Sequence, residues 1–206
     1  NASKIIVTGG NADTDNTLQL NTLDTETVTL DASAYVGVLT AQGSASATRI
    51  TLAGDQAHDV TGGAANDTIT MGETKTDVAV NLDGGAGTDI LTITDTGATI
   101  VDADFRGITS VATLNTGNGT NAITLASGAD ATGITTVTGG TGDDTIDASS
   151  VDFDNIVTIA GGTGRDVITG NITVKTIFDF NAITDLDPIG GLTIGDTDTD
   201  GAASTT

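Results

Sequence analysis

Short runs of alternating aliphatic and small polar residues recur along this 206-residue chain, and glycine-rich turns separate them. One aliphatic residue lies two positions before each turn begins, and another lies seven positions after its start. The residues before the turns are Val60, Leu82, Leu114, Val137 and Ile159, and those after them are Ile69, Leu91, Ile123, Ile146 and Ile168. Alternation with a period of two is typical of half-buried β-strands. Each repeat therefore predicts two short strands joined by a glycine turn.

The turns share a nine-residue phrase, whose positions are numbered here from its first residue. Three copies, Gly84–Thr92, Gly139–Asp147 and Gly161–Thr169, carry glycine at positions 1, 2 and 4, aspartate at position 6 and an aliphatic residue at position 8. Two further copies are imperfect. The copy starting at Gly62 has Ala65 at position 4 but keeps Asp67 and Ile69, and the copy starting at Thr116 keeps Gly117, Gly119 and Ile123 but has Asn121 at position 6.

The spacing of these copies predicts the fold. They start 22 or 23 residues apart, except for one interval of 32 residues between Gly84 and Thr116. Strands are expected before the turns at Val78–Leu82, Ile134–Thr138 and Asn155–Ala160, and after them at Asp67–Thr70, Asp89–Ile93, Thr145–Asp147 and Asp166–Thr169. Two strands per repeat at a constant period predict an all-β parallel β-solenoid, with two-strand coils of about 22 residues. A β-sandwich is the alternative, but sandwiches rarely repeat one turn sequence at constant spacing.

The rest of the chain is assigned around this centre. Residues 1–50 are expected to form degenerate coils of the same solenoid, and residues 51–170 its regular part. Residues 93–108, within the long interval, are expected to form an inserted loop or an extra strand. Residues 171–206 are expected to hold a capping strand, Ile172–Phe180, and a flexible acidic tail. Because Asn1 is not a start residue, the chain is expected to be a segment of a longer protein.

Composition limits the kinds of core and partner. The chain has 28 glycines, one proline, no cysteine, no tryptophan and few aromatic residues, which is too little bulk for an ordinary packed globule. Its mean hydropathy of +0.09 is too high for a disordered chain. The formal net charge is −22, which disfavours nucleic acid and anionic lipid as partners and favours divalent cations. The absence of cysteine is compatible with a secreted protein.

The repeated phrase itself indicates an oxygen-rich site. Paired glycines permit positive φ and direct backbone carbonyls outward, and an aspartate at position 6 returns a carboxylate to the turn. Stacked coils would then line up carbonyls and carboxylates, which suits Ca²⁺, and no His or Cys cluster favours a transition metal. The structural alternative is that the glycines serve only to bend the corner of a solenoid. The single histidine, His58, is expected to be a solvent-facing turn residue.

The phrase resembles the G-G-x-G-x-D-x-U-x repeat of the RTX, or haemolysin-type, calcium-binding proteins. This resemblance implies a parallel β-roll in which turn carbonyls and aspartates share Ca²⁺. Carried over by position, the implied ligands are the aspartates Asp67, Asp89, Asp144 and Asp166 and the carbonyls of Gly85, Gly87, Gly140, Gly142, Gly162 and Gly164. RTX repeats follow one another every nine residues, whereas here the phrases lie a full coil apart. We therefore expect one glycine-aspartate corner per coil, with calcium stacked mainly along one edge.

The sequence offers little material for catalysis, because it has no nucleophile-base pair and one histidine. We expect a structural protein that is not an enzyme. The resemblance implies an extracellular component of a bacterial surface layer (S-layer), exported by type I secretion and folded by calcium, with self-association into a lattice and no insertion into a membrane. The alternative is an RTX-type binding module or stalk of a secreted adhesin, protease or lipase.

Overall fold

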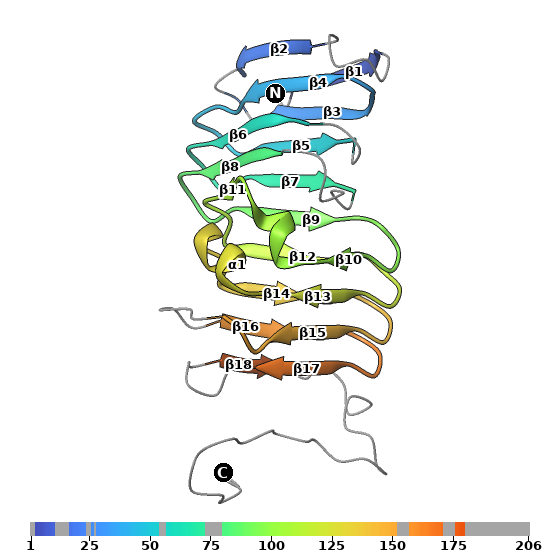
Figure 1. Cartoon of the computed structure of the whole chain (residues 1–206). Helices are drawn as coiled ribbons and strands as arrows, with labels where there is room; N and C mark the ends of the chain where they lie inside the picture. Colours follow the sequence, from blue (N-terminus) through green and yellow to red (C-terminus); the bar gives the residue numbers. More distant parts are fainter. Residues whose placement is uncertain are drawn as a thin grey trace, which may run out of the picture.

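The computed structural model describes residues 3–10, 17–23, 26, 28–53, 57–72, 80–151, 157–170 and 176–179. These residues wind into a parallel β-solenoid whose coils repeat about every 22 residues, which confirms the predicted fold class (Figure 1). Strands of successive coils lie side by side along the stack. Strands β1 and β2 lie at one end of it, and β17 and β18 lie at the other.

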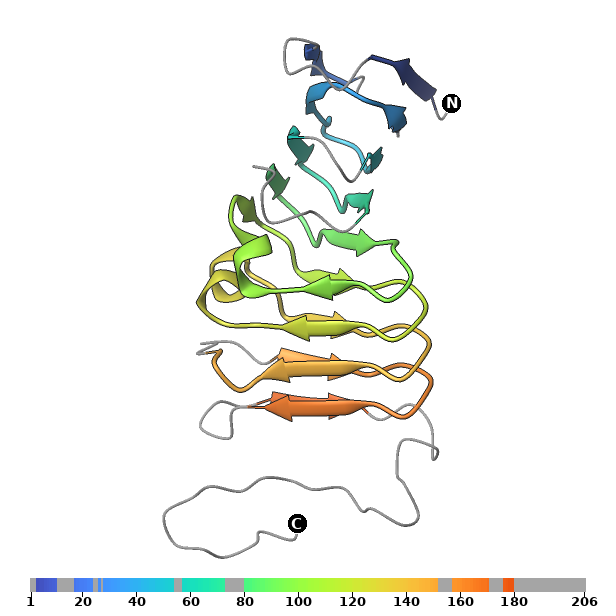
Figure 2. The same cartoon turned by 45° about the vertical axis from the view of Figure 1, so that its right-hand side comes forward.

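Three parallel sheets make up the described part of the stack. The long sheet contains β1 (Ser3–Gly9), β3 (Val28–Tyr35), β5 (Thr48–Leu52), β7 (Thr68–Met71), β9 (Ile90–Ile93), β12 (Thr113–Asn115), β14 (Thr136–Thr138), β16 (Val157–Ala160) and β18 (Thr176–Asp179). The N-terminal short sheet contains β2 (Thr17–Thr22), β4 (Val38–Gln42), β6 (Asp59–Gly63), β8 (Asn81–Gly85) and β11 (Ile108–Thr109). The C-terminal short sheet contains β10 (Thr99–Ile100), β13 (Ala122–Thr124), β15 (Thr145–Ala148) and β17 (Val167–Gly170), and Figure 2 shows its strands running opposite to those of the long sheet.

In-register aliphatic residues form the core. In the long sheet Ile69 is aligned with Leu91, which is aligned in turn with Leu114, and each is 1% exposed. The column continues on both sides through Ile50, Val137 and Ile159. In the C-terminal short sheet Ile123 is aligned with Ile146. Full burial of such a side chain stabilises a fold by about 1.5–3 kcal/mol. Stacking equal side chains from coil to coil thus builds a core with few aromatic residues.

The glycine phrases occupy two corners of the solenoid, so the expected single edge was wrong. The copies starting at Gly62 and Gly84 connect the N-terminal short sheet to the long sheet, through β6–β7 and β8–β9. The copies starting at Thr116, Gly139 and Gly161 connect the long sheet to the C-terminal short sheet, through β12–β13, β14–β15 and β16–β17. Figure 1 shows the first set of turns on the left of the stack and the second set on the right.

The change of edge takes place within the long interval of the repeat. This interval holds β9, β10, the 3-10 helix η1 (Asp102–Phe105), β11 and β12, so one coil contributes strands to all three sheets. Residues 93–108, expected to form an inserted loop or an extra strand, contain β10, η1 and the first residue of β11, so the extra-strand alternative is confirmed. The extra length of the interval arises because the chain must also cross the long sheet once more, through β12, before it meets the next phrase.

The coil from β9 to β12, within which the phrases change edge, is called here the transition coil. Asp102 links it to the next coil. Its carboxylate accepts hydrogen bonds from the backbone amides of Ala126 (2.8 Å), Gly128 (3.0 Å) and Ala129 (3.0 Å), at the start of helix α1 (Ser127–Thr132). These amides have no partner within the helix, so the carboxylate fixes where the helix begins.

No helix of the described chain has the length and apolar character needed to cross a membrane.

The flanks join the same sheets where they are described. The region expected to form degenerate coils contains β1 to β5, which pair in parallel with strands of the next coil. β1 pairs with β3, β2 with β4 and β3 with β5. Within the expected capping strand Ile172–Phe180, β18 pairs with β16 at the end of the long sheet. The expected acidic tail lies outside the described residues, as do residues 78–79 and 155–156 of the expected strands.

Candidate functional site

The corner glycines allow consecutive turns to stack closely. Gly140 and Gly142, at positions 2 and 4, have φ of 100° and 123°, a region that favours glycine. A Cβ on Gly162 would collide with the carbonyl oxygen of Gly140 in the preceding turn. The glycine at position 1 has another role, because a Cβ on Gly139 would lie 2.7 Å from Oδ2 of Asp144. The first glycine of the phrase thus makes room for the aspartate of its own turn.

One carboxylate oxygen of each position-6 aspartate binds the preceding coil. Oδ1 of Asp89 accepts a hydrogen bond of 2.7 Å from the backbone amide of Asp67, and Oδ1 of Asp67 accepts one of 2.5 Å from Thr48. At the opposite corner, Oδ1 of Asp144 accepts a hydrogen bond of 2.7 Å from the amide of Asn121. Oδ1 of Asp166 likewise accepts one of 2.8 Å from Asp144. The side chains therefore satisfy turn amides that the sheets do not pair.

The second carboxylate oxygen is left among other oxygen atoms. In Asp67, Asp89 and Asp144 the side chain is 1% exposed, and Oδ2 receives no hydrogen bond from the part of the chain that is described. A Cβ on Gly139 would contact both Oδ2 of Asp144 and the carbonyl oxygen of Gly161, so these two oxygens border the same space. Burial of a carboxylate oxygen without a hydrogen-bond donor is costly, so the Oδ2 positions favour a cation or a proton.

Asn121 shows which oxygens surround this position. Its Nδ2 lies 3.0 Å from the carbonyl oxygens of Gly117 and Gly119, 2.9 Å from that of Gly139 and 2.8 Å from Oδ1 of Asp144. Gly117 and Gly119 hold positions 2 and 4 of the phrase. Carbonyls at these positions thus converge on the side chain at position 6, as the implied ligand set requires.

One part of this neighbourhood, a main-chain carbonyl of the next coil, recurs at the aspartate corners. The next-coil carbonyl that contacts Nδ2 of Asn121 belongs to Gly139 at position 1. Its counterpart for Asp67 is the carbonyl of Gly84, since both Gly84 O and Oδ2 of Asp67 approach the space beside Gly62. The counterpart for Asp89 is the carbonyl of Ser110. A carboxylate oxygen therefore lies in the aspartate turns where an amide nitrogen lies at Asn121.

The electrostatics of the corners favour an uncharged or metal-bound carboxyl. Burial raises the pKa of Asp67, Asp89 and Asp144, and the backbone hydrogen bond to each side chain offsets only part of this effect. The neighbouring negative charge of Asp89 raises the pKa of Asp67 further, and that of Asp166 does the same for Asp144. A cation between the coils would remove both penalties.

The donor set fits a hard cation. No group of three or more His, Cys, Asp or Glu side chains gathers into a metal centre within the described ranges. The corners offer main-chain carbonyls and one or two carboxylate oxygens instead, which is the ligand chemistry of Ca²⁺. All four aspartates of the expected set lie at such corners, but the structure divides them into one pair, Asp67 and Asp89, and a second pair, Asp144 and Asp166, at opposite edges.

His58 lies in the interior, so its expected place on the surface was wrong. It is 1% exposed; its Nδ1 accepts the Leu39 amide at 3.3 Å, and its Nε2 lies 3.0 Å from the carbonyl oxygen of Ala53. These two contacts require the neutral ring with the proton on Nε2. Burial lowers the pKa of His58 and stabilises this neutral form. The residue links two coils and faces no other titratable group in these contacts.

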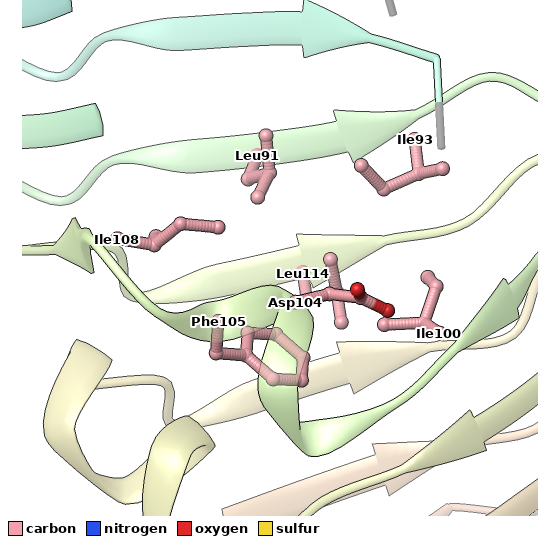
Figure 3. A pocket seen from close by; sticks show the side chains of 7 residues that line it. All are labelled: Leu91, Ile93, Ile100, Asp104, Phe105, Ile108 and Leu114. Carbon is pink, nitrogen blue, oxygen red and sulfur yellow. The ribbon is translucent and has the colours of Figure 1, made fainter. Parts of the chain in front are cut away.

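A small cavity marks the transition coil. It has a volume of about 10 Å³ and is lined by Leu91, Ile93, Ile100, Asp104, Phe105, Ile108 and Leu114. Figure 3 shows the carboxyl group of Asp104 beside Ile100 and Leu114. Its Oδ2 accepts the Val101 amide at 2.8 Å, and burial raises its pKa. With one polar side chain and room for about one water molecule, the cavity lacks the converging groups of a ligand site.

No protein-family model, curated protein or solved structure matches this chain.

Proposed function

We propose that this chain is a structural β-solenoid of a bacterial cell-surface layer, folded outside the cell by calcium bound at its glycine-aspartate corners. The observation that carries the proposal is the buried, donor-free Oδ2 of Asp67, Asp89 and Asp144. These oxygens lie beside main-chain carbonyls of the next coil. The proposal goes beyond corner bending, since glycines needed only for a bend would not require a buried carboxylate.

The residues would act as follows. Carbonyls at positions 2 and 4, including those of Gly85, Gly87, Gly140, Gly142, Gly162 and Gly164, and the position-6 aspartates would hold Ca²⁺ between successive turns. The ion would supply the positive charge that these oxygens lack. In the aspartate phrases the glycine at position 1 leaves room for the carboxylate beside the backbone.

Calcium would couple folding to location. The net charge of −22 opposes compaction of the metal-free chain, and ions that bind only the folded state stabilise it. A free calcium concentration of 100 times the dissociation constant adds about 2.7 kcal/mol for each independent site. The chain would remain expanded where calcium is scarce and fold after export by type I secretion. The corners would serve binding and stacking.

The shape of the stack also favours a second role, as the stalk or binding module of a secreted adhesin, protease or lipase. Coils follow one another from β1 and β2 to β17 and β18, so the described chain spans the stack from end to end. A spacer between other parts of a protein requires this arrangement. Self-association in calcium separates the roles, because a surface-layer component forms ordered two-dimensional sheets whereas a stalk remains monomeric.

Circular dichroism and thermal unfolding in EGTA, calcium and magnesium test the calcium proposal. We expect millimolar Ca²⁺ to increase β-structure and raise the Tm. Mg²⁺ should act more weakly, since it demands a near-octahedral site and dehydrates reluctantly. Identical spectra and an identical Tm in EGTA and in calcium would overturn the proposal.

A further inference from the structure

Asn121, Asp144 and Asp166 hold position 6 in three successive turns, and each is hydrogen-bonded to the next. They are called here the C-terminal column. The side-chain oxygen Oδ1 of Asn121 accepts a hydrogen bond of 2.8 Å from the amide of Ala98 in the transition coil. The backbone amide of Asn121 donates to Oδ1 of Asp144, 2.7 Å away in the next coil. Oδ1 of Asn121 therefore accepts a backbone amide of the preceding coil, as Oδ1 of aspartate does at position 6 of the other copies. The difference between the residue types lies in the second side-chain atom.

The amide nitrogen of Asn121 meets its surroundings without a metal. Nδ2 carries two hydrogens and lies within 3.0 Å of four oxygen atoms, so the hydrogens are shared among them. The opposite assignment of the amide would place its oxygen against these four acceptors and its nitrogen against the Ala98 amide, so the orientation is determined. The side chain is fully buried. Asn121 thus supplies, by hydrogen bonding, the positive charge density that the buried carboxylates lack.

We propose that Asn121 replaces a cation at its position, and that it forms a calcium-independent link between the transition coil and the C-terminal column. The inference rests on the proposed function, in which the equivalent space beside Asp144 takes Ca²⁺. Amide hydrogens directed at the four oxygens exclude a cation from this level. The C-terminal column would begin with Asn121, whose hydrogen bonds form without calcium. This residue follows directly after the coil in which the phrases change edge.

This arrangement predicts that an amide bonded to Asn121 and amides bonded to an aspartate respond unequally to calcium removal. The link uses the Ala98 amide, which bonds to Asn121, and the Asn121 amide, which bonds to Asp144. The Ala98 amide, whose acceptor is Asn121, should resist hydrogen exchange in EGTA better than the Thr48 and Asp67 amides, whose acceptors are aspartates. Calcium should increase protection at the aspartate-bonded amides of Thr48, Asp67 and Asp144 more than at Ala98.

The direct test is Asn121→Asp, with Asn118→Asp as the matched control. Asn118 lies in the same turn but is exposed, and its Oδ1 accepts the Thr141 hydroxyl at 2.7 Å, which an aspartate would still do. Both variants add one negative charge. We expect N121D to lower the Tm in EGTA by at least about 4 °C relative to N118D and to bind one more calcium ion per chain. An unchanged EGTA Tm relative to N118D, or no additional bound ion, would overturn the inference.

Asn121→Ala keeps the test decisive if N121D does not fold in EGTA. N121A removes the amide without creating a carboxylate, so it should lower the Tm in both EGTA and calcium and bind no additional ion. A larger gain in Tm from calcium in N121D than in N121A supports the inference, and an equal gain in both contradicts it. Failure of the proposed function has a different signature, because the unaltered chain itself would then bind no calcium.

Discussion

The backbone amide of Asp67 donates a 2.7 Å hydrogen bond to Oδ1 of Asp89, the residue at the same position of the phrase one coil later. The carboxylate of Asp89 therefore has a structural half, which holds the preceding turn, and a second half that receives no hydrogen bond in the described structure. The two halves can be separated by mutation, because asparagine keeps the first and replaces the second.

Asp89→Asn should behave as Asn121 does. It retains Oδ1 for the Asp67 amide and removes a buried carboxylate oxygen, so the metal-free protein should gain about 1–3 kcal/mol of stability while calcium binding falls. Asp89→Ala leaves the Asp67 amide without its acceptor and should destabilise both forms by about 1–3 kcal/mol. Denaturant unfolding in EGTA and calcium measures both effects. Equal losses in the two variants would show that Oδ2 has no special role.

The metal-free protein should become more stable as the pH falls. Burial raises the folded-state pKa of Asp67, Asp89 and Asp144 above the ordinary value of 3.8. Their favourable contribution is complete below pH 3.8, where both states are protonated, and it is lost as the pH rises through the raised folded-state pKa. Thermal unfolding in EGTA from pH 7 to pH 4 measures the trend.

A matched control separates these residues from general charge relief. Acidification also reduces the repulsion within a chain of net charge −22. Asp144→Asn should flatten the pH dependence, whereas Asp59→Asn, which removes an exposed charge, should leave it nearly unchanged. Equal slopes for the two variants would assign the effect to overall charge alone.

Gly139→Ala should destabilise the solenoid by collision rather than by backbone strain. Its Cβ would lie 2.7 Å from Oδ2 of Asp144 and would also contact the carbonyl oxygen of Gly161. Gly133→Ala is the comparison, since Gly133 has φ of 88° but its Cβ would meet nothing closer than 3.9 Å. We expect a loss of about 1 kcal/mol for G133A and a larger loss for G139A, measured by urea unfolding. A smaller loss for G139A would contradict the packed corner.

His58→Gln should be less stable than the unaltered chain at pH 7 and should lose that disadvantage in acid. Burial lowers the folded-state pKa of His58 below the ordinary 6.5. Its contribution is therefore present above pH 6.5 and declines as the pH falls through the lowered value, by up to about 1.4 kcal/mol for each pH unit. Urea unfolding in saturating calcium from pH 7 to pH 5 gives the difference between the two proteins. A constant difference would show that folding does not change the pKa of His58.

The regular part of the fold could be predicted because it depends on local pattern. A 22-residue period and fixed offsets between glycine and aliphatic residues determine the coil, and Ile69, Leu91 and Leu114 align in the core as this pattern requires. The phrase places Asp89 and Asp144 in turns, and the structure adds that both residues are buried.

The change of edge could not be predicted from spacing. Both corners join strands of opposing sheets, so one phrase fits either corner, and the 32-residue interval indicates extra chain without showing where it lies. The burial of His58 depends on the Leu39 amide, which the stacking of coils brings to it. The sequence likewise shows that Asn121 replaces aspartate. It does not show that two of the four oxygens around its nitrogen belong to Gly139 and Asp144, in the turn of the next coil.

The most direct test of the calcium corners is to count bound ions by equilibrium dialysis in the unaltered chain and in Asp67→Asn/Asp89→Asn/Asp144→Asn. The control is Asp59→Asn/Asp95→Asn/Asp143→Asn, which removes the same charge from exposed positions. We predict that the buried-site variant loses most of the bound calcium while the control keeps it. Equal calcium content in the two triple variants would show that the buried aspartates do not bind calcium.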